Sequence, residues 1–120
     1  MTGAWVIAVA LVIGGAAQLV VTSRTSSGRL GRNKFAGIRT RATMLTDDNW
    51  LAAHQAAQPF GMRSGQAFLA SGLVVPVARV GQLLALAGVG FGIVCLYLST
   101  RAAVRAVTPI ARQETSDPKA

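Results

Sequence analysis

The stretch that decides the fold, residues 31–54, reads GRNKFAGIRTRATMLTDDNWLAAH. It contains four of the twelve basic residues, two of the four acids and the only histidine of the 120-residue chain. Long apolar segments lie on both sides of it. A polar stretch between apolar runs of membrane-crossing length predicts a membrane protein whose polar chemistry is concentrated in one loop.

The composition separates the chain from ordinary soluble domains. Hydrophobic residues make up 52% of it and charged residues only 13%, against about 25% charged residues in a typical soluble domain. Basic residues outnumber acids by 12 to 4, for a formal charge of +8. In a soluble protein this balance would indicate nucleic-acid binding, but in an apolar chain it is typical of cytoplasmic loops. The expected partner is a bilayer with anionic headgroups, and not nucleic acid.

Three apolar runs have the length of membrane spans. The eighteen residues 4–21 carry no charge and would cover about 27 Å as a helix, close to the hydrocarbon thickness of a bilayer. No basic side chain precedes them and no cleavage site follows, which argues against a signal peptide. A tight turn near Pro76 joins the other two runs in a helical hairpin. We expect one all-α membrane domain over residues 1–120, with three transmembrane helices at about 4–21, 60–78 and 80–98.

Small residues recur at helical spacing in each apolar run. Such faces favour close contact between helices in a membrane. We expect them to pack helices within the chain, or to bind a membrane-protein partner or a second copy. The residues are Ala10, Gly14 and Ala17 in the first run, Ala67 and Ser71 in the second, and Gly88 and Gly92 in the third.

A helix with a strong start signal follows the basic part of the loop. Thr46 is a good N-cap residue, and Asp47 and Asp48 place carboxylates at the positive end of the helix dipole. Leu45 and Trp50 have the spacing of a hydrophobic staple. The sequence therefore predicts a short amphipathic helix from Asp47 that leads into the second span.

One face of this helix carries Trp50, Ala53, His54 and Ala57 at spacings i, i+3, i+4 and i+7. That face lies either at the membrane surface or packed under the spans. Pro59 either kinks the helix or begins a new one as its first residue.

The distribution of basic residues predicts the orientation. With three spans, the loop (residues 22–59), the start of the second span and the tail (residues 99–120) hold eleven of the twelve basic residues. Only Arg79 is left on the other side. This asymmetry predicts a multi-pass membrane protein with its N-terminus outside and its loop and C-terminus in the cytoplasm. The expected headgroup contacts are Arg24, Arg29, Arg32, Lys34, Arg41, Arg63, Arg101 and Arg105.

The ends of the spans carry further signals. Trp5 and Tyr97 fit anchors at the outer and inner interfaces. The third helix is expected to stop at Thr108 and Pro109. Residues 111–120 are expected to be disordered.

The loop resembles a known family. The string from Gly31 to Thr40 and the residues after it are similar to the signature N-x-x-x-G-I-R-T-P-x-T, followed by W-x-x-x-(N/H), of the SdpI family of bacterial membrane proteins. Arg41 departs from this pattern, since the family usually has proline there, and Pro59 stands where glycine is usual. The matching positions are Asn33, Gly37, Ile38, Arg39, Thr40, Thr43, Trp50 and His54.

The resemblance covers roughly the whole chain. It implies one span, this loop and a two-span hairpin, which is a minimal version without the additional spans of longer members. For one member it implies immunity to a secreted peptide toxin and sequestration of a small repressor at the membrane. We therefore expect SdpI-like immunity, resistance or membrane-linked signalling through the cytoplasmic loop. The alternative is a small accessory or structural subunit of a larger membrane complex.

Arg39, with Thr40 and Thr43, is the sharpest candidate site. A guanidinium and two hydroxyls near a membrane surface form a site for a phosphate or carboxylate. Alternatively, Arg39 pairs with Asp47 or Asp48 and only folds the loop.

His54, one turn after Trp50, is either a proton or ligand site or a hydrogen-bonded structural residue. A lone histidine and the single Cys95 predict no metal site and no internal disulfide. No nucleophile can be paired with a base, so we predict no catalytic residue, no cofactor and no enzymatic activity. The residues predicted to bind a ligand or partner are Asn33, Gly37, Arg39, Thr40, Thr43, Trp50 and His54.

Overall fold

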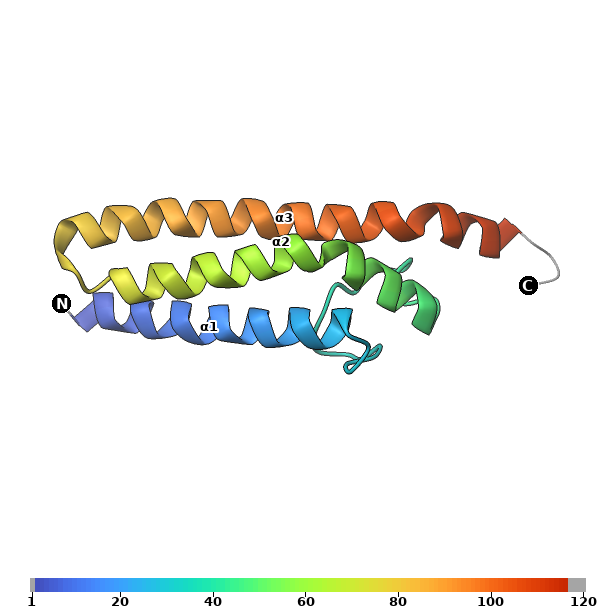
Figure 1. Cartoon of the computed structure of the whole chain (residues 1–120), viewed down its shortest axis with the longest axis horizontal. Coiled ribbons are helices and arrows are strands. Elements are labelled where there is room, and N and C mark those ends of the chain that lie inside the picture. The colour runs from blue at the N-terminus through green and yellow to red at the C-terminus, as the bar shows by residue number, and fades with distance from the viewer. Residues whose placement is uncertain (1, 117–120) are drawn as a thin grey trace.

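The computed structural model describes residues 2–116, which form three helices and no strand. The helices are α1 (Thr2–Ser26), α2 (Asp47–Val74) and α3 (Ala78–Ser116). The all-α prediction is therefore confirmed for these residues. The molecule extends over 62 × 21 × 19 Å, with the helices side by side and the loop of residues 27–46 toward one end (Figure 1).

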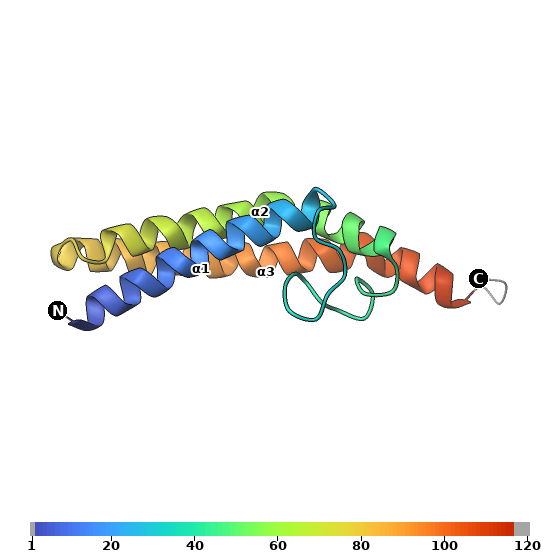
Figure 2. The same cartoon turned by 90° about the horizontal axis from the view of Figure 1, so that it is seen from below.

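The middle position belongs to α2. It packs against α1 on one side and against α3 on the other, while α1 and α3 make no close backbone contact with each other within the described residues. Figure 1 shows α2 between the other two helices, and Figure 2 shows α1 crossing them at an angle. α2 is therefore the helix that holds the other two together.

Small residues allow α2 and α3 to approach closely. A Cβ atom on Gly92 would lie 2.8 Å from the ring of Phe68, and one on Gly88 would overlap the hydroxyl of Ser71. The predicted Gly88-x-x-x-Gly92 face is thus used inside the chain, against α2.

The contact between α1 and α2 uses a different face of α1 from the one predicted. A Cβ atom on Gly15 would lie 2.6 Å from the backbone nitrogen of Leu69, so Gly15 marks the close approach. Ala10, Gly14 and Ala17 are exposed, and a Cβ atom on Gly14 would meet nothing within 4 Å. This predicted packing face is therefore free on the outside of the bundle.

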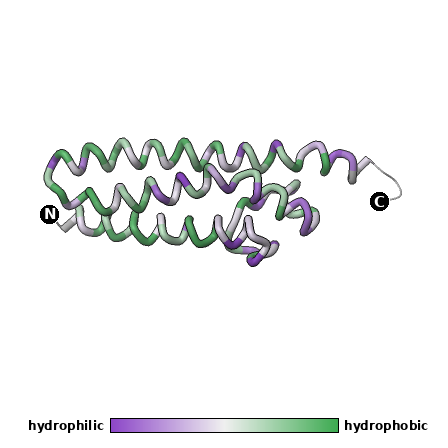
Figure 3. Tube along the Cα trace, in the orientation of Figure 1, coloured by the Kyte–Doolittle hydropathy of each residue, from purple (hydrophilic) through white to green (hydrophobic). Residues whose placement is uncertain are grey.

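Two of the three helices are long and apolar enough to cross a membrane, Gly3–Ser26 and Ala78–Gln113. Their large apolar side chains, such as Val6 on α1 and Leu83 on α3, are exposed, and hydrophobic residues dominate the end of the bundle away from the loop (Figure 3). The predicted second span within α2 is less apolar, because polar residues such as Arg63 interrupt it. Two candidate spans are thus observed where three were predicted.

α1 is longer than the predicted first span. It continues past Val21 to Ser26, so the first five residues of the predicted loop, 22–26, are helical. The hydroxyl of Thr25 donates to the carbonyl of Val21 over 2.7 Å, and that of Ser26 donates to the carbonyl of Thr22 over 2.7 Å. These bonds satisfy the hydroxyls without leaving the helix. Gly28, at φ +80°, follows the helix end.

α2 begins at Asp47, as predicted. The hydroxyl of Thr46 accepts the backbone N–H of Asn49 over 3.0 Å and caps the helix. The helix continues through Pro59 to Val74, so no new helix begins at the proline, and Figure 1 shows the helix bending near its middle. A proline in a helix interior removes one backbone hydrogen bond and favours such a bend.

α3 continues through Pro109 to Ser116, so the predicted stop at Thr108 and Pro109 is wrong. Residues 111–116, predicted to be disordered, are helical, and residues 117–120 lie outside the described residues. Packing explains the extension, because this part of α3 is anchored just before the proline. The buried cluster there consists of Ala53 and Ala57 of α2 and Ala103 and Val107 of α3.

Candidate functional site

Trp50 and His54 support the loop from α2. Their ring centroids lie 4.2 Å apart, and only 2% and 5% of the two residues are exposed. The indole Nε1–H of Trp50 donates a hydrogen bond to the carbonyl of Leu30 over 2.9 Å. The predicted face of this helix therefore packs against the loop and α3, which is the second of its two predicted places.

Both ring nitrogens of His54 are engaged within the chain. The backbone N–H of Ile38 donates to Nε2 over 2.9 Å, so Nε2 is an unprotonated acceptor. Nδ1 lies 2.7 Å from the carbonyl of Trp50 and is therefore the protonated donor. Burial lowers the pKa of His54 from its ordinary value of 6.5, against the opposing effect of the Trp50 carbonyl. His54 is thus neutral at pH 7 and holds the loop in place.

Gly37 lies directly over these two rings. Its φ of +102° is in the region that favours glycine. A Cβ atom there would lie 2.6 Å from Cη2 of Trp50 and 2.9 Å from Nε2 of His54. Only glycine allows the backbone to pass this close and still present the Ile38 N–H to His54.

Thr43 fixes the turn that follows. Its fully buried hydroxyl accepts the backbone N–H of Thr40 over 2.9 Å and lies 2.8 Å from the carbonyl of Ile38, to which it donates. The hydroxyl of Thr40 lies 3.3 Å from that of Thr43. Thr43 is thus committed to the loop backbone, whereas Thr40 borders the cavity described below.

Asn33 and Arg32 shape the first half of the loop. The side-chain oxygen of Asn33 accepts the backbone N–H of Ala36 over 2.8 Å, which closes a turn. Arg32 forms an ion pair with Asp47 at 2.8 Å and donates to the carbonyl of Met44 over 3.0 Å. The side chains of Asn33 and Arg32 therefore stabilise the conformation of the loop.

Arg39 is the exception among these loop residues. It is exposed, and it forms no hydrogen bond or ion pair with any residue of the described chain. The alternative prediction that Arg39 pairs with Asp47 or Asp48 is therefore wrong, because Arg32 is the residue that binds Asp47. The structure leaves the Arg39 guanidinium available to bind a ligand.

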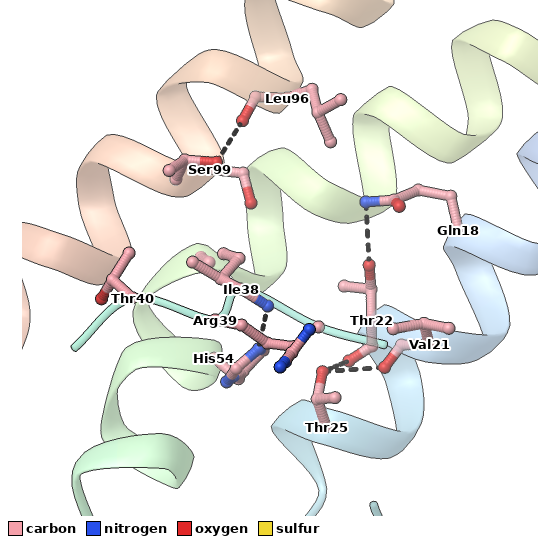
Figure 4. A pocket seen from close by; sticks show the side chains of 13 residues that line it. Gln18, Val21, Thr22, Thr25, Ile38, Arg39, Thr40, His54, Leu96 and Ser99 are labelled. Atoms are coloured by element: carbon pink, nitrogen blue, oxygen red, sulfur yellow. Dashed lines mark hydrogen bonds between the residues drawn. The ribbon is translucent and has the colours of Figure 1, made fainter. Parts of the chain in front are cut away.

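A cavity of about 350 Å³ lies beside Arg39, between the loop, α1 and α3. In Figure 4 the Arg39 side chain extends toward α1. None of the thirteen lining residues is acidic. They are Gln18, Val21, Thr22 and Thr25 of α1, residues 37–40 of the loop, His54 and Ala57 of α2, and Leu96, Ser99 and Thr100 of α3. We call this space the Arg39 cavity.

The seven predicted binding residues thus divide into two groups. Gly37, Arg39, Thr40 and His54 line the Arg39 cavity. Asn33, Thr43 and Trp50 do not line it and instead hold the loop through the bonds given above. The eight residues predicted to contact headgroups are all exposed. Within residues 2–116, no three His, Cys, Asp or Glu side chains gather to hold a metal ion.

Comparison with known proteins places this geometry in a family. The profile of the SdpI/YfhL protein family matches residues 29–99, more than half of the chain. The chain belongs to the SdpI/YfhL protein family. The resemblance seen in the loop is therefore confirmed. Searches of curated proteins and of solved structures found no match. Family membership and the two long apolar helices together indicate a membrane protein.

In this SdpI/YfhL protein, the matched region contains the loop, α2 and the first half of α3. The α1 wall of the Arg39 cavity lies outside it. Sequence reasoning missed the other nine cavity residues. Two of these are Thr22 of α1 and Ser99 of α3. Each follows directly after a predicted span, and Gln18, Thr22 and Thr25 recur at i, i+4 and i+7. That polar stripe at the end of an apolar run was the available signal.

Proposed function

We propose that the chain crosses the bacterial cell membrane three times, with its N-terminus outside and its loop in the cytoplasm. Two helices, α1 and α3, are candidate spans. α2 packs between them and runs antiparallel to both (Figure 1), and this arrangement supports a third crossing by α2. The basic residues of the described chain lie toward the loop end, except for Arg79 in the first turn of α3, which supports the orientation.

In that membrane the protein acts as an SdpI-like immunity or signalling protein, and the loop is its working surface. Family membership supports the class of function. The loop is chosen as the working surface because its residues differ in how they are bound. Trp50, His54 and Thr43 fix its backbone, whereas Arg39 is exposed without a partner in the described chain. An unpaired side chain on a rigid backbone is suited to binding a ligand or a partner.

The test compares survival of the host bacterium with and without the gene. Deletion strains are challenged with defined membrane-active peptides and with the culture medium of competing strains. Loss of the gene is expected to lower the tolerated dose, and wild-type protein to restore it. Arg39→Ala is expected to behave like the deletion at equal protein abundance in the membrane fraction.

Arg41→Ala is the matched control. Arg41 is an exposed arginine of the same loop that does not line the Arg39 cavity, so its substitution removes the same charge. We expect it to restore tolerance fully. Equal protection by Arg39→Ala and wild type would exclude Arg39 as the working residue.

A role as an accessory subunit is favoured by one observation, the outward face of Ala10, Gly14 and Ala17 on α1. Small residues on an exposed membrane helix suit contact with another helix. The test is purification in mild detergent, followed by mass measurement of the complex. A large protein at fixed stoichiometry that is lost in Gly14→Leu supports this role, and a monomer or homodimer contradicts it.

A further inference from the structure

The Arg39 cavity is rich in hydrogen-bond donors without acceptors in the chain. Arg39 makes no bond to the described residues, as shown above. Ser99 is 97% buried, being 3% exposed, and its hydroxyl makes no hydrogen bond in the described chain. The hydroxyl of Thr22 accepts the amide of Gln18 at 3.4 Å but donates to no described residue. The Ser99 hydroxyl opens onto the cavity, because among the described residues only Oγ of Ser64, which does not line this cavity, is both fully enclosed and without a partner. A ligand that accepts hydrogen bonds can therefore reach these donors.

The charge around the cavity also favours an acceptor. None of the lining residues is acidic, and the neutral His54 presents an acceptor nitrogen that the Ile38 N–H already occupies. Asp47, one of the two acids at the start of α2, is paired with Arg32. The positive charge of Arg39 is therefore uncompensated by the cavity walls, and an arginine fork matches a phosphate group.

A second, more apolar cavity lies further from the loop in the same bundle. This cavity of about 450 Å³ also lies between α1 and α3, and Leu11, Leu86 and Val89 are among its lining residues. Leu11 precedes Gln18 by seven residues, as Val89 precedes Leu96, so in each helix the two cavities lie on one face. Seven residues rise about 10 Å along a helix. Between α1 and α3, the polar side chains thus gather in the cavity at the loop end, whereas Gln82 is the one polar side chain that lines the second cavity.

We propose that these two cavities bind one acidic phospholipid, with its phosphate at Arg39, Ser99 and Thr22 and an acyl chain between α1 and α3. The polar groups would contact the headgroup of the lipid, and the apolar residues would contact its acyl chain. In the proposed three-span arrangement, the polar end lies where the spans leave the membrane, at headgroup depth. The inference deepens the proposed function and rests on its topology and its Arg39 surface, but it does not require the immunity activity.

The test is lipid binding by the purified full chain in a neutral detergent, followed by native mass spectrometry. The probes are dioleoyl phosphatidylglycerol, dioleoyl phosphatidylcholine with the same chains, glycerol 3-phosphate and inorganic phosphate. We expect one saturable phosphatidylglycerol per chain and at least about tenfold weaker phosphatidylcholine binding. A hundredfold excess of either soluble phosphate should not displace the lipid. If it does, the site holds a free anion and the lipid assignment is overturned.

Two pairs of variants assign the site. Arg39→Gln is expected to weaken phosphatidylglycerol binding about tenfold or more, and Arg41→Gln, which removes the same charge from the same loop, by less than about twofold. Ser99→Ala should weaken binding about fivefold. Thr108→Ala is the control on the same helix, because the Thr108 hydroxyl donates to the Val104 carbonyl and does not line the Arg39 cavity, and it should leave binding almost unchanged. Equal losses in both arginine variants would indicate diffuse attraction and overturn the proposal.

Folding and function are separated from binding in the same experiment. Each variant is first checked for helical circular dichroism and for the emission of the buried Trp50, and Ser99→Ala provides a second route if Arg39→Gln does not fold. Lipid binding that is lost in Arg39→Gln while cell survival is unchanged supports the lipid site and excludes Arg39 as the working residue of the immunity role. Full binding by Arg39→Gln alongside lost protection overturns the lipid site and leaves the immunity role standing.

Discussion

The backbone N–H of Ile38 donates to Nε2 of His54 over 2.9 Å, across sixteen residues of sequence. This bond joins the middle of the loop to the second turn of α2. It requires an unprotonated Nε2, because a protonated nitrogen has no lone pair to accept with. The position of Ile38, and of Arg39 next to it, therefore depends on the protonation state of one histidine.

Acidification is expected to loosen the loop. Burial lowers the pKa of His54 in the folded loop below 6.5, so the unfolded loop binds the proton more readily. The stabilisation from neutral His54 is complete above pH 6.5 and declines as the pH falls below it, until folded His54 is itself protonated. Hydrogen exchange of the Ile38 amide from pH 8 to pH 5, corrected for the intrinsic rate, measures this. The loss of Ile38 amide protection at low pH should be absent in His54→Gln. Protection in wild type that does not depend on pH would contradict the prediction.

Gly37→Ala is expected to destabilise the loop by about 1–3 kcal/mol, because it adds strain at positive φ and a methyl group against the Trp50 and His54 rings. The emission of Trp50 in a Trp5→Phe background, followed during thermal unfolding, reports the change. Gly31→Ala is the control, since a Cβ atom there meets nothing within 4 Å. An effect of Gly37→Ala no larger than that of Gly31→Ala would contradict the close approach.

Thr43→Val is expected to cost about 1–3 kcal/mol, because it leaves the Thr40 N–H and the Ile38 carbonyl without their buried partner. Thr43→Ser keeps the hydroxyl and should retain most of the stability. Amide exchange at residue 40 distinguishes the two variants. If serine is as damaging as valine, the methyl group and not the hydroxyl holds the turn.

Gly88→Leu is expected to push α2 and α3 apart and to lower stability by about 1–3 kcal/mol, because a side chain there overlaps Ser71. Gly90→Leu places the same side chain on the same helix where a Cβ atom meets nothing within 4 Å. Melting temperatures in detergent compare the pair. Similar temperatures for both variants would show that the Gly88 face is not packed.

Val107→Ala is expected to cost about 1–2 kcal/mol, because Val107 is fully buried against Ala53 and Ala57. Ile110→Ala removes more side chain from a position that is 40% exposed and should cost less. Denaturation followed by Trp50 emission gives both values. The reverse order would show that α3 does not support α2 beyond Arg101.

Sequence rules for helix ends succeeded where the helix end depends only on residues close by in the sequence. The start of α2 could be predicted because Thr46 caps a backbone N–H only three residues away. The same kind of rule failed at Thr108 and Pro109, since the cost of proline in a helix was outweighed by the packing of Val107 on α2. Ser26 lies within the predicted loop, and its hydroxyl bonds back to the Thr22 carbonyl of the helix.

The candidate site was only half predictable for a related reason. The family string contains Arg39, Gly37 and His54, so sequence could identify them. The arginine that binds Asp47 could not be chosen from sequence, because Arg32 reaches it only once the loop has turned at Asn33. Thr22 and Ser99 are separated by most of the chain and meet at one cavity only through α2.

The central place of α2 also bears on how the chain assembles during synthesis. Within the described residues each helix packs only against its neighbour in sequence, α1 with α2 and α2 with α3. Contacts between neighbouring elements form quickly and need no large rearrangement. The ribosome therefore releases the helices in the order in which they pair, and α3 docks last onto an α1–α2 pair that already exists. Each helix is expected to pack as soon as the next one has been synthesised, because no close backbone contact joins helices of the described chain that are distant in sequence.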